Sequence, residues 1–171
     1  ENYDKFKIFG QIDIRNYFNV KEQKIVQSIN DGTDDYIINI NENDYVKHLT
    51  NEAEVNSLEI NFDDMEISQD SEKISQETIR QMQYGHYFPS PYMDNQGKID
   101  LKQAYRFHIP FSGDSCLLQC IPFPMRVRLN IDTEVNDQKF SFKIIKYNND
   151  DQVKKDLDQS IKDIKEQLNY V

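Results

Sequence analysis

The sequence predicts an α+β protein: an antiparallel sheet with helices packed on one face and a long amphipathic helix at the C-terminus. Three observations support this. Residues 104–111 alternate apolar and polar side chains, which is typical of a half-buried strand. Two further alternating segments, 125–131 and 139–146, follow closely. After them, apolar residues recur every three or four positions to the end of the chain, which is the spacing of one helix face.

The strand at 104–111 is expected to turn an apolar side toward the core. That inner face comprises Tyr105, Phe107, Ile109 and Phe111. Ser112, Gly113 and Asp114 follow with turn chemistry, because glycine tolerates positive φ and the two polar side chains can bond nearby backbone. The short polar connection 132–137 predicts that strands 125–131 and 139–146 pair as a hairpin.

The C-terminal helix is expected to begin near Asn149, a good N-cap residue, and to cross the apolar side of the sheet. Its stripe comprises Val153, Leu157, Ile161, Ile164, Leu168 and Val171. Because no stop signal precedes Val171, the sequence predicts that this is a fragment of a longer protein.

The N-terminal half is less regular. The pattern indicates strand-like residues between Phe6 and Ile14, a helix over 20–29, and a strand over 58–62. A second helix should run from Asn41 or Asn43 to about Glu54. Its buried side is expected to carry Tyr45, Val46 and Leu49.

The whole of 1–171 is expected to form a single α+β domain. Within it, 68–103 is interpreted as a mobile connector followed by an ordered aromatic loop. The polar segment 68–83 carries only a weak helical stripe, and 84–97 combines prolines and glycines with aromatic residues.

Composition excludes some classes of function. The net charge is −10, so the overall field repels nucleic acid and anionic membranes. No segment approaches the roughly 18 consecutive apolar residues of a membrane span, so no membrane association is expected. Two cysteines are too few for a disulfide scaffold, which favours a cytoplasmic location.

The search for catalytic chemistry yields little. Cys116 and Cys120 lie one helical turn apart near His108, but a structural zinc site normally needs four ligands, so both cysteines are interpreted as buried, small apolar residues. No nucleophile, phosphate-loop or metalloprotease motif is present. We therefore predict no catalytic residue, no metal site and no cofactor.

Cations gather on the outer faces of the three late strands. The candidate contact residues are Arg106, His108, Arg126, Arg128, Lys139 and Lys143. Two interpretations remain open. These residues could bind an anionic ligand or a partner, since planar guanidinium groups suit carboxylate and phosphate. Alternatively, the face is merely solvated, or it is neutralised by the acidic segment 31–72, which holds thirteen acids and one lysine.

The segment His108-Ile109-Pro110-Phe111-Ser112-Gly113-Asp114, followed by Leu117-Leu118, a strand pair and a charged helix, resembles the N-terminal region of uncharacterised bacterial proteins. The similarity covers about residues 104–171. In that family the chain continues into a domain similar to PD-(D/E)xK nucleases, found beside restriction and defence genes. The family often has Arg-Pro-Ser where this chain has Cys120-Ile121-Pro122-Phe123. The resemblance implies a non-catalytic recognition or assembly module, with any nuclease motifs beyond Val171.

The leading functional hypothesis is therefore a non-enzymatic module of a larger bacterial cytoplasmic protein. It would hold a protein partner, or the rest of its own chain, through the basic sheet face or the outgoing helix, with nucleic acid a less favoured ligand. One alternative is a metal-dependent hydrolase that uses Asp63, Asp64 and Glu66. The other is an extracellular ligand-binding domain.

Overall fold

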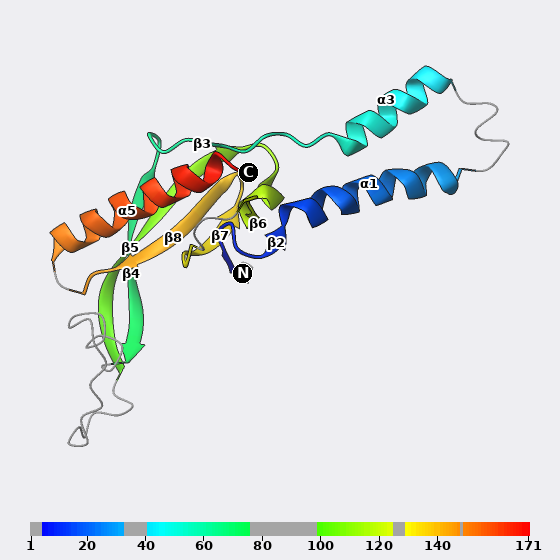
Figure 1. Cartoon of the computed structure of the whole chain (residues 1–171). Helices are drawn as coiled ribbons and strands as arrows, with labels where there is room; N and C mark the ends of the chain where they lie inside the picture. Colours follow the sequence, from blue (N-terminus) through cyan, green and yellow to red (C-terminus); the bar gives the residue numbers. More distant parts are fainter. Residues whose placement is uncertain (1–4, 33–40, 76–98, 125–128, 148) are drawn as a thin grey trace.

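The computed structural model describes residues 5–32, 41–75, 99–124, 129–147 and 149–171. Figure 1 shows a sheet covered on one side by the C-terminal helix, and a pair of helices that extends away from it. The helices are α1 (Ile14–Asn30), α3 (Glu42–Ala53) and α5 (Asp150–Leu168), with a short 3₁₀ turn at Ser115–Gln119. This architecture confirms the predicted α+β class.

The main sheet is antiparallel and is built around β5 (Ile99–Ser112). On one side β5 pairs with β8 (Lys139–Ile145), which pairs with β7 (Asp132–Asn136) and then β1 (Phe6–Lys7). On its other side β5 pairs with β4 (Glu66–Ser75) and with β3 (Glu59–Ile60). Separately, β2 (Ile12–Asp13) pairs in parallel with β6 (Cys120–Ile121).

The predicted inner face of β5 is confirmed. Phe107 lies opposite Phe142 on β8, and their rings stack with centroids 5.6 Å apart. Ile109 lies opposite Phe140, and both are fully buried. Because side chains alternate across a strand, this pairing collects the large apolar groups on one side of the sheet.

Helix α5 covers this apolar side, as predicted. Asn149 is its N-cap and accepts a hydrogen bond from the backbone N–H of Gln152. Ile164 is fully buried in the core and Val153 nearly so, whereas Leu157 and Leu168 are partly buried against it. The stripe therefore packs on the strands, and Val171 also contacts the core beyond the end of the helix.

The prediction of a strand at 125–131 is wrong at its C-terminal end. Residues 129–131 are not in a strand, and 125–128 lie outside the described residues. The strand is instead β7, which occupies the segment predicted to be the hairpin connection. The turn follows at Asp137 and Gln138, whose φ angles are 46° and 60°. A two-residue turn with positive φ matches the twist of paired strands, so the hairpin forms later in the chain than predicted.

The prediction of a connector from residue 68 is also wrong. Residues 66–75 form β4, which pairs with β5 along its whole length. Their polarity hid this strand, because acids occupy one of its faces. Residues 99–103 belong to β5, while the proposed aromatic loop at 84–97 lies outside the described residues.

In the N-terminal half, Asn41 is confirmed as the N-cap of α3. Helix α1 begins earlier than predicted, at Ile14, and the predicted strand 58–62 shortens to Glu59–Ile60. In the described part of the chain, no helix combines the length and apolar character of a membrane span.

Candidate functional site

The predicted basic face lies on the side of the sheet opposite the apolar core. β5 places Arg106 and His108 there, and β8 places Lys139 and Lys143 beside them, with Arg106 directly opposite Lys143. Arg126 and Arg128, the other two predicted members, lie outside the described residues. The alternation along two paired strands thus brings four of the six residues together.

Acids from neighbouring strands already pair with the cations of this face. The Arg106 guanidinium lies 2.5 Å from Glu134 on β7 and 3.3 Å from Asp70 on β4. The Lys143 ammonium lies 3.0 Å from Asp70 and 2.7 Å from Glu72. Most of these acids come from the segment 31–72, so the interpretation that this segment neutralises the face is the one that fits.

Two further contacts extend this ionic network. Lys139 lies 2.8 Å from Glu66, and the His108 ring lies 3.0 Å from the hydroxyl of Ser68. Burial lowers the pKa of His108, and the nearby Arg106 charge lowers it further, so the imidazole is neutral at pH 7. Acidic and basic side chains therefore alternate on this face, and it is not a uniformly basic surface.

The pKa values follow from the same contacts. The hydrogen bond from Lys143, helped by the backbone N–H of Ser71, lowers the pKa of Asp70 to about 2. Burial lowers the pKa of Lys143, but its bonds to Glu72 and Asp70 raise it by more. Both partners thus stay charged across the physiological range, and each charge stabilises the other.

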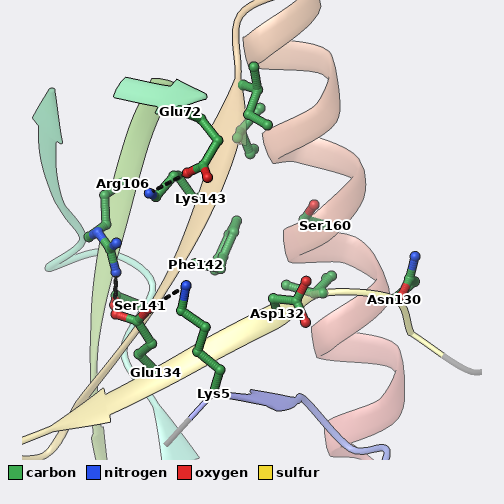
Figure 2. Close-up of a pocket in the computed structure, with 13 residues that line it drawn as sticks. Lys5, Glu72, Arg106, Asn130, Asp132, Glu134, Ser141, Phe142, Lys143 and Ser160 are labelled. Atoms are coloured by element: carbon green, nitrogen blue, oxygen red, sulfur yellow. Dashed lines mark hydrogen bonds and ion pairs between the residues drawn. The ribbon is translucent and has the colours of Figure 1, made fainter. Parts of the chain in front are cut away.

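A pocket of about 420 Å³ lies beside β8, between the ionic network and α5. Figure 2 shows Arg106 and Lys143 bonded to acids at its wall, with Ser160 of α5 on the other side. Its cations are Lys5, Arg106 and Lys143, and its acids are Glu72, Asp132 and Glu134. Because three acids balance three cations and every one of these cations has an acidic partner, the pocket offers no ready anion site.

The other predicted candidates do not converge on one site. Cys120 is buried and its Sγ donates to the Cys116 carbonyl, whereas Cys116 is exposed, contrary to the prediction of two buried thiols. Burial raises the pKa of Cys120 to about 11, so this thiol is a poor nucleophile. Among the described residues, no three His, Cys, Asp or Glu side chains group as a metal site would require.

Two of the three carboxylates of the hydrolase alternative already have a partner. Glu66 pairs with Lys139 on the sheet face, while Asp64 accepts a hydrogen bond of 2.7 Å from the Asn61 amide. The Asn61 side chain in turn accepts from the backbone N–H of Asp63. This is the bonding of an Asx turn, and it explains the acidic cluster through local structure.

Both N-terminal helices were predicted, but not that α1 and α3 pair as a helical arm, which extends away from the sheet (Figure 1). The two helices are antiparallel: Lys21 donates to the carbonyl of Glu54 at 3.1 Å, and the Tyr45 hydroxyl donates to the carbonyl of Ser28 at 3.3 Å. Ile25 and Leu49 are half-buried between them. A seam this narrow leaves much of each helix exposed.

Several large apolar side chains are exposed on one side of the arm. Exposed fractions are 46% for Phe18, 50% for Val26, 42% for Ile29 and 55% for Val46. The prediction that Val46 lies on a buried side is therefore wrong. These four residues are called the apolar face of the arm below.

Helix geometry places the apolar face on one side of the arm. Successive residues of an α-helix are rotated by about 100° around its axis. Viewed from the N-terminus of α1, Phe18, Val26 and Ile29 all lie clockwise of the seam residue Ile25. Val46 lies clockwise of Leu49 in the same sense on α3. Because two facing antiparallel helices turn their clockwise sides in the same direction, all four residues share one face.

The opposite side of the arm is polar. A groove there is lined by Lys24, Gln27 and Asp31 of the α1 side and by Glu52 of α3. Val20, which is 51% exposed, lies about 180° from Ile29 around α1 and so falls away from the apolar face. The arm is thus amphipathic as a two-helix unit.

The base of the arm is attached to the body by specific bonds. The Tyr17 hydroxyl donates to Asp114, and Lys21 lies 3.7 Å from the same carboxylate. Gly113 has φ of +94°, and a Cβ at this position would lie only 2.1 Å from the carbonyl oxygen of Ser57. Glycine is therefore required where the chain leaving α3 passes the end of β5.

Comparisons of the chain with protein-family models, with curated proteins and with solved structures gave no match. The resemblance of residues 104–171 to the bacterial nuclease-linked proteins therefore stays a prediction.

Proposed function

We propose that this chain is a non-enzymatic recognition or assembly module that holds a protein partner on the apolar face of its helical arm. The observation that carries the proposal is the exposure of Phe18, Val26, Ile29 and Val46 on one side of a projecting helix pair. Several exposed apolar residues on one side of a helix pair are a common feature of protein interaction sites.

The proposal places binding on the arm rather than on the sheet. An anion or a nucleic acid approaching the sheet face would have to displace carboxylates that already bond Arg106 and Lys143. A partner approaching the arm displaces only water from apolar side chains, which is favourable. The net charge of −10 also favours a protein partner over a nucleic acid.

The setting we propose is the bacterial cytoplasm, within a larger protein. Cys116 and Cys120 are free thiols, which fits a reducing compartment. The link to nuclease-type defence proteins rests on the resemblance of residues 104–171 alone.

A photo-crosslinking amino acid tests the proposal in cells that make the protein. We expect the probe at position 26 to give protein adducts and the probe at position 20 to give few. The two native valines are equally exposed on one helix but lie on different sides of the arm. Equal yields at both positions, or none at either, would contradict the proposal.

A further inference from the structure

We infer that the Asp114 carboxylate is the joint that fixes the direction of the helical arm relative to the body, and that the arm pivots as a unit when this carboxylate is lost. Both legs of the arm run back into the body (Figure 1). Helix α1 enters at Ile14 and the chain leaving α3 enters at Leu58, and both side chains are buried in the core. Two buried anchors at the base, one on each leg, still allow rotation about the line that joins them.

Asp114 adds contacts further along α1. Its carboxylate accepts a hydrogen bond from the Tyr17 hydroxyl and lies 3.7 Å from the Lys21 ammonium. At a rise of about 1.5 Å per residue, these two residues lie about 4.5 and 10 Å beyond Ile14 along the helix axis. They are four positions apart and so share one side of α1. Contacts spread along the axis oppose the rotation that the buried anchors alone would allow.

The same residue also holds the other leg of the arm. The backbone N–H of Asp114 donates to the carbonyl of Asn56 at 3.0 Å. Lys21, which lies beside the Asp114 carboxylate, donates to the carbonyl of Glu54, the C-cap of α3, at 3.1 Å. Both legs therefore meet at one position, immediately after the glycine that lets the chain leaving α3 pass so close to the end of β5.

The body in turn holds the Asp114 side chain in place. The carboxylate oxygen that does not bond Tyr17 accepts from the backbone N–H of Cys116 at 3.1 Å, which caps the 3₁₀ turn. Burial raises the pKa of Asp114, but the bonds from Tyr17 and from the Cys116 N–H lower it by more, so the group is charged at pH 7. Because hydrogen bonds to an ionised acceptor are stronger than neutral ones, this single carboxylate ties α1 firmly to the turn.

Pulsed electron–electron resonance on the purified chain tests the joint. Nitroxide labels are attached through Val26→Cys on the arm and Lys155→Cys on α5, both exposed positions, in a chain that also carries Cys116→Ala to remove the exposed native thiol. We expect one narrow distance distribution in this chain, and a distribution roughly twice as wide or more when Asp114→Ala is added, as for a released hinge. The control Asp132→Ala removes an exposed, ion-paired acid of the body and should leave the width unchanged.

Tyr17→Phe is a second variant that leaves Asp114 itself in place. It keeps the aromatic ring and removes only the hydroxyl that bonds the carboxylate, while the cap on the Cys116 N–H remains. This variant should also widen the distribution. A label pair within the arm, at positions 26 and 47, should keep its distance in every one of these proteins, because the arm moves as a unit.

An unchanged width in either Asp114→Ala or Tyr17→Phe, or an equal widening in Asp132→Ala, would overturn the inference. Widening between positions 26 and 47 would overturn it as well, because the two helices would then be separating rather than pivoting together. Equal cross-linking at positions 26 and 20 would reject the proposed function and leave the role of Asp114 untouched, since the joint does not depend on what the arm binds.

Discussion

Arg106 illustrates how the partners of one side chain decide its role. Its place on the polar side of β5 follows from strand alternation, but its partners Asp70 and Glu134 are 36 and 28 residues away in sequence. The guanidinium is mostly shielded from water and bonds both acids as well as Ser141. These hydrogen bonds connect β5 with β4, β7 and β8, so Arg106 stabilises the sheet.

Lowering the pH should weaken this ionic network by protonating the Asp70 carboxylate. Its pKa is about 2 in the folded chain, below the ordinary 3.8, so its contribution is fully present above about pH 4 and is lost as the pH falls toward 2. The contribution is on the order of 1 kcal/mol or less, because the carboxylate is partly exposed and screened by solvent. Urea unfolding from pH 5 to pH 2 should show a smaller loss of stability for Asp70→Asn than for the native chain.

The Asp70→Asn variant should still lose some stability as the pH falls. Glu66, Asp114 and Asp150 also have lowered pKa values, and their contributions fall in the same acidic range. Parallel pH curves for the two proteins would mean that Asp70 contributes nothing to the folded state.

At the scale of elements, α5 and the arm helices are all amphipathic but meet different surroundings. The stripe of α5 finds the aromatic side of the sheet and is buried there. The stripe of α1 buries only Ile14, at the base of the arm, and α3 buries none of its residues fully. Similar periodicity thus leads to a core contact in one case and to an exposed face in the other.

Helix α5 should be essential for stability through Ile164. This side chain is fully buried, so Ile164→Ala removes apolar contacts and leaves a cavity. We expect a loss of about 2–5 kcal/mol in the free energy of unfolding, measured by urea denaturation. Ile161→Ala, on the same helix but only partly buried, is the matched control and should cost less. Equal losses would mean that α5 does not pack as described.

At the scale of the whole molecule, the chain divides into a packed body and an arm. The body holds the large aromatic contacts, whereas the arm is held by one narrow seam and by the bonds of Tyr17 and Lys21 at its base. Local stability depends on buried apolar contacts, so the two parts should open at different free energies.

Hydrogen exchange should make this division visible. In dilute solution, amides of α1 beyond Lys21 and of α3 should exchange faster than those of β5 and β8, since the arm can open without unfolding the body. Uniform protection in dilute solution would contradict the description of the arm as a separate, weakly held unit.

Local sequence periodicity predicted which side chains share a face. Alternation in 104–111 and 139–146 predicted two strands and their aromatic side, and the three-and-four spacing after Asn149 predicted α5 and its buried stripe. It also placed Arg106, His108, Lys139 and Lys143 together. Periodicity carries this information because it reflects the repeat of the backbone alone.

What covers each face is visible only in the folded chain. It showed that 66–75 is a strand whose acids neutralise the cations, which a polar segment does not reveal in isolation. It showed as well that, within the described residues, α1 and α3 meet along a narrow seam that leaves Val26, Ile29 and Val46 exposed. Both results depend on contacts between segments far apart in the chain, and no local repeat encodes which distant segment will meet a given face.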